Sequence, residues 1–307
     1  MTTRLTLVGY GKIAADQHLP AITADPRFEL AGVSTRSRNP ELGVPWFATP
    51  GEMFAGLRGQ ADAVAICTPP EVRHAIAKAA LAAGLDVLLE KPPAATVGAL
   101  DDLARQAEEA GRVLFTAWHS QHAAGVEAAR AALAGQGIAE VRVSWREDVR
   151  KWHPGQDWVW EPQGFGVFDP GINALSILTR ILPVPLLIDD ARLSVPANRQ
   201  TPIAVSLRFA GLGGAQFDWR HSEHEEWAIE VRTERGRQVR LEGGGAKLFV
   251  DGAEQPLDGR GEYPALYAHF AELLAARRSF VDREPLRMVA DALLLATREP
   301  VEPFDWS

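Results

Sequence analysis

The sequence is short of several features that would define other classes of protein. Its 307 residues include a single cysteine, Cys67, which excludes an internal disulfide. No apolar run approaches the roughly 18 residues that a membrane span needs. There is no basic run, and a formal net charge of −8 disfavours nucleic-acid binding. Together with a start that lacks an apolar signal region, these absences predict a soluble, cytoplasmic protein that acts on small molecules.

Lysine is also scarce, with five residues against 27 arginines. Because the chain uses arginine as its ordinary surface cation, a lysine in a special position deserves closer study. The length is near the point at which one hydrophobic core gives way to two, so two domains are expected.

The first 120 residues alternate between short apolar runs and helix-like segments. This order predicts a parallel, doubly wound sheet, because parallel strands need crossover connections. We expect a helix after the first strand to end near Pro20. The predicted strands are Leu5–Val8, Phe28–Ser34, Ala63–Cys67, Asp86–Leu89 and Val113–Ala117, and the later helices are Pro50–Leu57, Glu71–Ala83 and Val97–Ala110.

The pattern changes after about residue 125 to strands joined by short turns. We expect an α+β domain with an open, mainly antiparallel sheet, one face of which is covered by helices over Pro170–Ile181, Tyr263–Arg278 and Leu286–Thr297. The division predicted is residues 1–121 for an α/β Rossmann domain that binds NAD(P), and 122–307 for substrate binding and oligomerisation. The uncovered face of the second sheet is the expected surface for a homo-oligomer.

The segment Gly9-Tyr10-Gly11-Lys12-Ile13-Ala14 follows the first strand and opens the first helix. This is the context of a dinucleotide-binding fingerprint, in which one glycine permits a tight turn and the next lets the backbone approach a pyrophosphate. We therefore predict cofactor contacts at Gly9, Gly11, Lys12 and Ile13.

The end of the second strand indicates which dinucleotide is bound. NAD-selective sites usually carry an acidic residue there, whereas this chain has Ser34-Thr35-Arg36-Ser37-Arg38. Hydroxyls and guanidinium groups suit a 2′-phosphate. We predict a preference for NADP with NAD also accepted, against the alternative that the arginines are solvated loop residues.

Two strand ends at the carboxyl edge of the sheet carry the sequences Thr68-Pro69-Pro70 and Glu90-Lys91-Pro92-Pro93. With the N-terminal fingerprint, these motifs resemble the glucose-fructose oxidoreductase, inositol dehydrogenase and rhizopine-catabolism (Gfo/Idh/MocA) family. The resemblance implies a catalytic Lys91, a cis Lys91-Pro92 bond, and cofactor contacts from Thr68, Pro69, Glu90 and Lys91.

The family's second signature is an aspartate followed four residues later by a histidine. Here Asp169 is kept and Asn173 replaces the histidine, which removes the usual proton acceptor at neutral pH. A carboxylate and an amide one helical turn apart suit the hydroxyls of a polyol. The general base is then expected to be Asp169 or Lys91, and the sequence leaves open which of them accepts the proton.

Three segments resemble the subgroup of the family that oxidises D-galactose and L-arabinose: Trp118-His119-Ser120, residues 145–156 and residues 167–176. That resemblance implies that Glu147, His153, Asp169 and Asn173 line a sugar pocket. His119 is either a further sugar-binding residue or a structural histidine. The spacing of His and carboxylates fits no standard metal site, so no metal is expected.

These features predict oxidation of an aldopyranose at C1 to the aldonolactone, with hydride transfer to NAD(P). Two alternatives remain: a dinucleotide-binding regulator without catalysis, and a dehydrogenase of inositol-like cyclic polyols. The sequence does not separate D-galactose, L-arabinose and D-fucose.

Overall fold

The computed structural model describes residues 2–36, 42–161 and 164–305. Ser37 and Arg38, which the sequence offers as phosphate-binding residues, lie outside the described residues. The chain forms two compact units. The first combines Met1–His119 with Gly261–Arg283, and the second combines Ser120–Arg260 with Glu284–Ser307.

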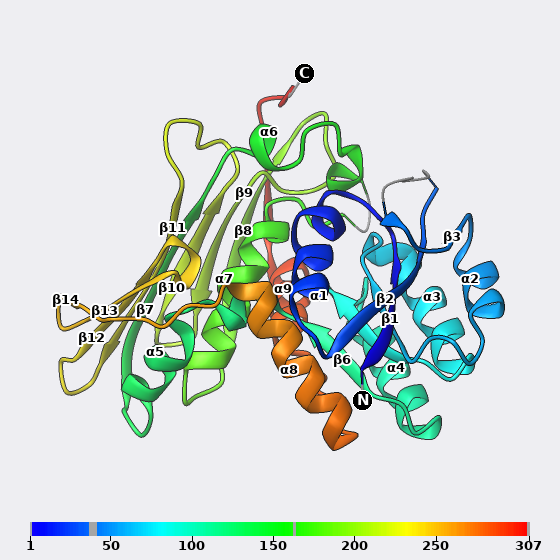
Figure 1. Cartoon of the computed structure of the whole chain (residues 1–307). Coiled ribbons are helices and arrows are strands. Elements are labelled where there is room, and N and C mark those ends of the chain that lie inside the picture. The colour runs from blue at the N-terminus through cyan, green and yellow to red at the C-terminus, as the bar shows by residue number, and fades with distance from the viewer. Residues whose placement is uncertain (1, 37–41, 162–163, 306–307) are drawn as a thin grey trace. The chain divides into compact units, whose positions relative to one another are not determined.

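The first unit contains a parallel sheet, as predicted. In the described residues its strand order is β3-β2-β1-β4-β5-β6, and every pair is parallel (Figure 1). The strands are β1 (Thr3–Val8), β2 (Phe28–Ser34), β3 (Trp46–Phe47), β4 (Ala63–Ile66), β5 (Asp86–Glu90) and β6 (Leu114–Ala117). The helices are α1 (Leu19–Ala24), α2 (Pro50–Gly56), α3 (Pro70–Ala82), α4 (Val97–Glu109) and α8 (Glu262–Ala276).

The helical segment after the fingerprint does not end near Pro20, as expected, but continues to Ala24. Residues Ala14–His18 form a π-helix, and Pro20 falls in the first turn of α1 directly after it. Proline is tolerated in the first turn of a helix because its missing N–H needs no partner there.

The second unit contains a mixed sheet in which most neighbours are antiparallel. Its order over the described residues is β14-β13-β12-β11-β7-β10-β9-β8-β15, with parallel pairs only at β7–β10 and β8–β15. The strands are β7 (Ile138–Arg146), β8 (Ile188–Pro196), β9 (Ala204–Phe209), β10 (Gly213–Asp218), β11 (Glu226–Thr233), β12 (Gln238–Glu242), β13 (Lys247–Val250), β14 (Ala253–Glu254) and β15 (Thr297–Val301). The helices are α5 (Val126–Leu133), α6 (Val149–Trp152), α7 (Phe168–Ile181) and α9 (Glu284–Leu295).

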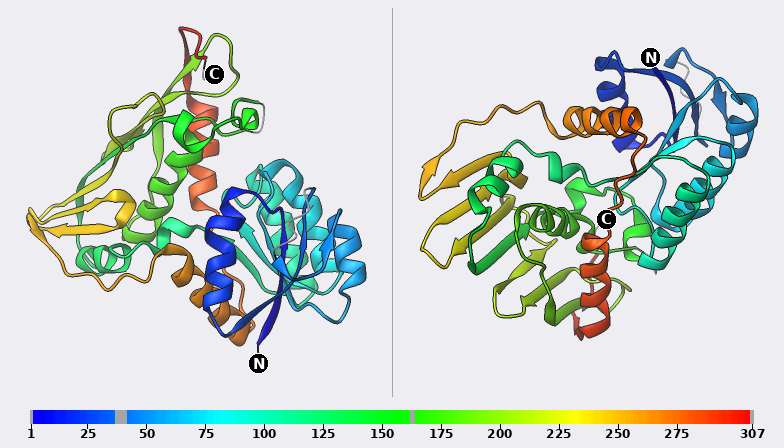
Figure 2. Two further views of the ribbon diagram at one scale, coloured as in Figure 1. Left: turned by 45° about the horizontal axis from the view of Figure 1, so that its top comes forward. Right: turned by 90° about the horizontal axis from the view of Figure 1, so that it is seen from below.

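Three helices, α5, α7 and α9, pack against one face of this sheet (Figure 2). The other face carries charged side chains in ion pairs, including Arg142 with Glu140, Arg232 with Glu140, and Arg240 with Glu230. The two faces therefore differ as the alternation of buried and exposed residues along β7 and β11 requires.

The predicted helix over Tyr263–Arg278 is present as α8, but its predicted packing on the second sheet is wrong. Tyr263, Leu266, Tyr267 and Phe270 are buried in the core of the first unit. The ring of Phe270 stacks on Phe28 at 6.1 Å. Helix α8 thus completes the core that β1, β2 and α1 begin.

Candidate functional site

The glycine turn after β1 has the geometry of a dinucleotide-binding loop. Gly9 has a φ of +86°, and a Cβ there would lie 3.0 Å from the backbone nitrogen of Thr68, so the turn requires glycine. No atom lies within 4 Å of the position that a Cβ on Gly11 would occupy. Open space beside the backbone at Gly11 is what a pyrophosphate needs for close approach, and these residues therefore fit a dinucleotide.

The neighbouring predicted cofactor residues are exposed to different degrees. Ile13 is 38% exposed, and the exposed Lys12 pairs with Asp16. At the end of β2, Ser34 is buried and its carbonyl accepts a hydrogen bond from Gly9 N–H at 2.9 Å.

The two residues that follow Ser34 are increasingly accessible. Thr35 is half-buried, and its carbonyl accepts a hydrogen bond from the Trp46 indole at 3.0 Å. Arg36 is exposed. Its guanidinium is accessible to a ligand at this end of the strand.

The carboxyl ends of β4 and β5 are linked by Arg73, a residue that the sequence analysis missed. This arginine of α3 is only 2% exposed, and its guanidinium donates to the carbonyls of Thr68, Glu90 and Pro92. The Lys91-Pro92 bond between the last two carbonyls is cis, which confirms the prediction. The Thr68 hydroxyl oxygen is buried and has no hydrogen-bond partner among the described residues. Pro69 is exposed.

Glu90 is buried beside Lys91 and is held in a network of hydrogen bonds. One carboxylate oxygen accepts from the Tyr263 hydroxyl at 2.5 Å and lies 3.3 Å from His18 Nε2, while the other accepts from the Lys91 N–H at 2.5 Å. Burial alone would raise the pKa of Glu90, but the hydrogen bond and charge of His18, with help from His119 and Tyr263, lower it to about 2. Glu90 is therefore ionised.

His18, the partner of Glu90, is fully buried. Burial alone would lower the pKa of His18, but Cys67, Tyr267 and Glu90 together raise it well above its usual range. Its Nδ1 lies 2.8 Å from the Tyr267 hydroxyl. His18 and Glu90 thus form a buried ion pair one residue from Lys91.

His119, the ambiguous histidine, belongs to the edge of the same cluster. Its Nδ1 lies 2.6 Å from a carboxylate oxygen of Glu262, and its ring stacks on Tyr263 at 5.4 Å. Both partners come from the start of α8. A contact of His119 with sugar stays a prediction.

In the second unit, the structure brings Asp169 and His153 together. His153 Nε2 lies 3.2 Å from Asp169 Oδ2, with the carboxylate side chain 7% and the imidazole side chain 14% exposed. Asp169 lies in the first turn of α7, where the helix dipole stabilises a negative charge. The turn before it depends on Gly166, whose φ is +53° and where a Cβ would lie 2.4 Å from the Pro202 carbonyl.

Glu147 and Asn173 lie in the same unit. Glu147 is buried, and its two carboxylate oxygens accept hydrogen bonds from the indoles of Trp219 at 3.2 Å and Trp227 at 3.0 Å. Asn173 lies one turn after Asp169 on α7 and is half-buried, and its carbonyl accepts from the Ser176 hydroxyl. A carboxylate oxygen can accept more than one hydrogen bond, so Glu147 keeps the capacity to bind a sugar hydroxyl.

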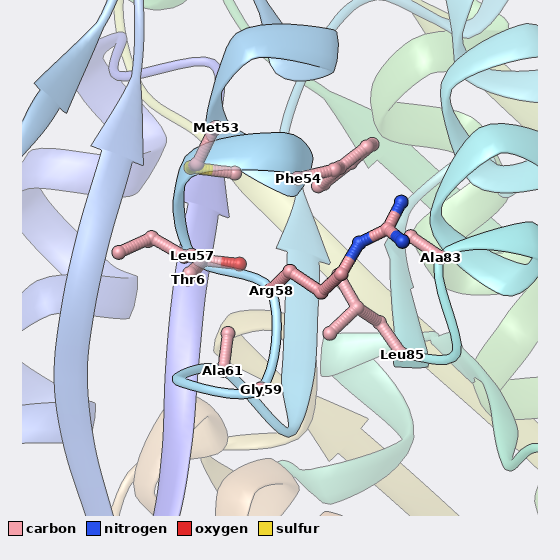
Figure 3. A pocket seen from close by; sticks show the side chains of 9 residues that line it. All are labelled: Thr6, Met53, Phe54, Leu57, Arg58, Gly59, Ala61, Ala83 and Leu85. Atoms are coloured by element: carbon pink, nitrogen blue, oxygen red, sulfur yellow. The ribbon is translucent and has the colours of Figure 1, made fainter.

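A small pocket elsewhere in the first unit does not carry this chemistry. Figure 3 shows the residues that line it, among which Thr6 and Arg58 carry polar side chains. Gly59, Ala61, Ala83 and Leu85 of the lining precede β4 and β5, at the opposite edge of the sheet from Thr68 and Lys91. It contains neither a carboxylate nor a histidine side chain.

Two other features are not found among the described residues, a metal-binding cluster and a membrane-spanning helix. Within them, no group of three or more His, Cys, Asp or Glu side chains is placed to hold a metal ion. None of their helices is both long and apolar enough to cross a membrane.

Comparison with known proteins assigns the chain to a family. The model for an oxidoreductase family with an NAD-binding Rossmann fold, Gfo/Idh/MocA, matches residues 3–118. Galactose 1-dehydrogenase of Pseudomonas fluorescens is 47% identical, with 98% of each chain covered. The chain belongs to the Gfo/Idh/MocA oxidoreductase family. The predicted family and the predicted class of enzyme, a nicotinamide-dependent oxidoreductase, are thus confirmed.

Solved structures of other proteins agree with the fold described above. D-galactose-1-dehydrogenase from Rhizobium etli superposes with a TM-score of 0.92 at 47% identity, covering 99% of this chain and 98% of that one. A 3-ketoreductase from Actinomadura kijaniata, solved with NADP, has a TM-score of 0.86 at 18% identity and covers 98% and 100%. The latter likeness concerns the fold alone.

Proposed function

We propose that the enzyme oxidises an aldopyranose of the D-galactose, L-arabinose or D-fucose type at C1, with NAD(P) as the hydride acceptor and the aldonolactone as product. The observation that carries this proposal is the full-length likeness to galactose 1-dehydrogenase. The division of roles expected from the sequence, residues 1–121 for the cofactor and 122–307 for the sugar, stays part of the proposal, except that Gly261–Arg283 belongs to the first unit.

The reaction removes a hydride from C1 and a proton from the C1 hydroxyl, and the C1–O bond becomes a carbonyl. Bound nicotinamide supplies the hydride acceptor. The proton needs a positioned acceptor on the protein. Asp169 and Lys91 share this task in our proposal: the carboxylate accepts the proton, and the ammonium stabilises negative charge that develops on the oxygen.

His153 supports the choice of Asp169 as the acceptor. Its Nε2 is 3.2 Å from Asp169 Oδ2, so an imidazole stands beside the carboxylate although Asn173 occupies the family's histidine position. A carboxylate beside an imidazole can pass its proton on at neutral pH. In this proposal Glu147, His153 and Asn173 also bind hydroxyl groups of the sugar ring. His119 stays a further candidate for sugar binding.

For the cofactor, we propose a preference for NADP with NAD also accepted. The exposed Arg36 at the end of β2 supports this choice, since a guanidinium pairs with phosphate through two hydrogen bonds. We propose that the cofactor also contacts Gly9, Gly11, Thr68 and Glu90, which lie at the same edge of the sheet.

The decisive experiment measures reduced nicotinamide formation with each of the three sugars and each cofactor. Wild type should turn over at least one sugar, and Lys91→Ala and Asp169→Asn should each lower kcat by at least about 100-fold. His153→Gln should lower kcat more than it raises KM. The exposed Lys78→Ala and Asp157→Asn serve as matched controls with wild-type rates.

Other outcomes of this experiment would favour the alternatives. Cofactor binding without turnover of any aldose would favour a regulator, and turnover of inositol alone would favour a cyclic polyol dehydrogenase. Loss of activity in the control variants as large as in Lys91→Ala and Asp169→Asn would contradict the assignment of the two residues.

The location and assembly of the enzyme remain part of the proposal. We propose that it acts in the cytoplasm and forms a homo-oligomer through the uncovered face of the second sheet. That face carries paired charges of both signs, so a copy of itself is a suitable partner. Sedimentation at low and high salt would test this, because screening should shift such an assembly toward monomer.

A further inference from the structure

A buried ion pair between His18 and Glu90 lies at the end of β5. Both side chains are buried, and Glu90 is bonded at the same time by Tyr263 and by the Lys91 backbone. Taking two charges out of water is costly, and only their mutual attraction and further hydrogen bonds can offset that cost. The backbone that the pair contacts indicates a role beyond stability.

What the pair holds is the backbone of Lys91. The Glu90 carboxylate accepts from the Lys91 N–H at 2.5 Å, and Arg73 donates to the carbonyls immediately before and after Lys91, those of Glu90 and Pro92. The amide and both flanking carbonyls are thus fixed by buried charged groups. The backbone position from which the Lys91 side chain extends is therefore fixed.

We propose that Glu90, aligned by His18 and Tyr263, is a positioning residue that fixes Lys91 in its reactive orientation. The inference rests on the proposed catalytic role of Lys91. It adds two positioning residues that are distant in sequence, since His18 precedes Glu90 by 72 positions and Tyr263 follows it by 173. Positioning of this kind matters because a small misplacement of a catalytic group can lower the rate by one or two orders of magnitude.

Helix α8 provides a matched pair of variants for a test. Tyr263→Phe removes the hydroxyl that donates to Glu90, whereas Tyr267→Phe removes a hydroxyl that contacts His18 and not Glu90. Both replacements leave the aromatic ring in the same core, so both should fold. Glu90→Gln extends the series. Its amide has one oxygen and one NH2 group, so it cannot accept hydrogen bonds from both the Tyr263 hydroxyl and the Lys91 N–H through separate oxygens.

We expect Tyr263→Phe to lower kcat about tenfold with KM for sugar and the dissociation constant of NADP within about twofold of wild type. Tyr267→Phe should leave kcat within about twofold. Glu90→Gln should show the largest loss of kcat, and Glu90→Asp should recover less than half of it, because the shorter carboxylate cannot reach all three donors. Equal losses in the two phenylalanine variants, or no loss in either, would overturn the proposal.

A second readout separates this inference from the proposed function. The rate at which an amine-specific reagent labels Lys91, measured by mass spectrometry, reports on its environment whether or not a sugar is turned over. It should change at least about threefold in Tyr263→Phe and stay at the wild-type rate in Tyr267→Phe, with Lys78 as the internal reference. If wild type turns over no sugar but labelling changes as expected, the proposed function fails and the positioning role stands. Unchanged labelling in Tyr263→Phe and Glu90→Gln would overturn the positioning role.

Discussion

Replacing both members of the buried ion pair, in a His18→Gln/Glu90→Gln double variant, should remove a stabilisation that depends on pH in a defined way. Glu90 has its pKa lowered from 4.5 to about 2, and its contribution is therefore complete above pH 4.5 and lost as the pH falls toward 2. His18 has its pKa raised well above 6.5, so its contribution is complete below pH 6.5 and lost as the pH rises through the raised value.

The magnitude on the acid side follows from the carboxyl. A pKa difference of 4.5 minus about 2, at about 1.36 kcal/mol per pH unit, corresponds to about 3 kcal/mol. No reduction for solvent is needed because Glu90 is only 3% exposed. By pH 3.5 somewhat less than half of this should be gone, since the unfolded carboxyl is by then mostly protonated while the folded one is not.

Hydrogen exchange of peptides from β4, β5 and α8 at several urea concentrations would report the free energy of unfolding of the first unit. The difference between wild type and the double variant isolates the pair, because the other titrating groups are common to both. It should be constant between about pH 4.5 and 6.5 and decline on both sides. A difference that stays constant down to pH 3.5, or that grows there, would refute the reasoning.

Three further variants test the glycine turn and the cofactor's phosphate. Gly9→Ala should lower the thermal midpoint of unfolding, because its φ of +86° and a contact of 3.0 Å with Thr68 strain any side chain, at a cost of about 1–2 kcal/mol. Gly11→Ala should leave that midpoint unchanged and weaken binding of both dinucleotides about tenfold, since its side chain enters open space that the pyrophosphate needs; calorimetric titration distinguishes the two glycines. Arg36→Ala should weaken NADP at least about tenfold more than NAD, and equal weakening of both would contradict the phosphate assignment.

Much of the fold was predictable because local patterns determine it. The alternation of apolar runs and helices predicted five of the six described strands of the first sheet, with bounds that differ by one residue from those of β4, β5 and β6, but it missed the two-residue strand β3. The same local reasoning failed for α8, since apolar residues at helical spacing show that a helix has a buried face but not which sheet covers it. The predicted helix end near Pro20 was wrong for a related reason. A proline disrupts a helix only at a position where the backbone N–H must donate a hydrogen bond within the helix.

The site was predictable in its members but not in their partners. Asp169 and His153 were both expected near the sugar, yet only the structure shows the 3.2 Å between them. Arg73 was overlooked because an arginine on an exposed-looking helix is usually solvated. Glu90 was expected to touch the cofactor, whereas its three donors come from distant segments and its own neighbour.

The return of α8 to the first unit has a consequence for how the protein is made. A ribosome releases residues 1–119 long before Gly261–Arg283, so the early β-α layers must wait, with the surfaces of Phe28 and Phe115 uncovered, while the intervening 141 residues are synthesised. A fragment that stops at residue 121 would keep every cofactor motif and still lack Tyr263, and with it a hydroxyl that reaches Glu90. The core of the first unit is therefore incomplete until its last helix, α8, has been synthesised, even though every cofactor motif precedes that helix by more than a hundred residues.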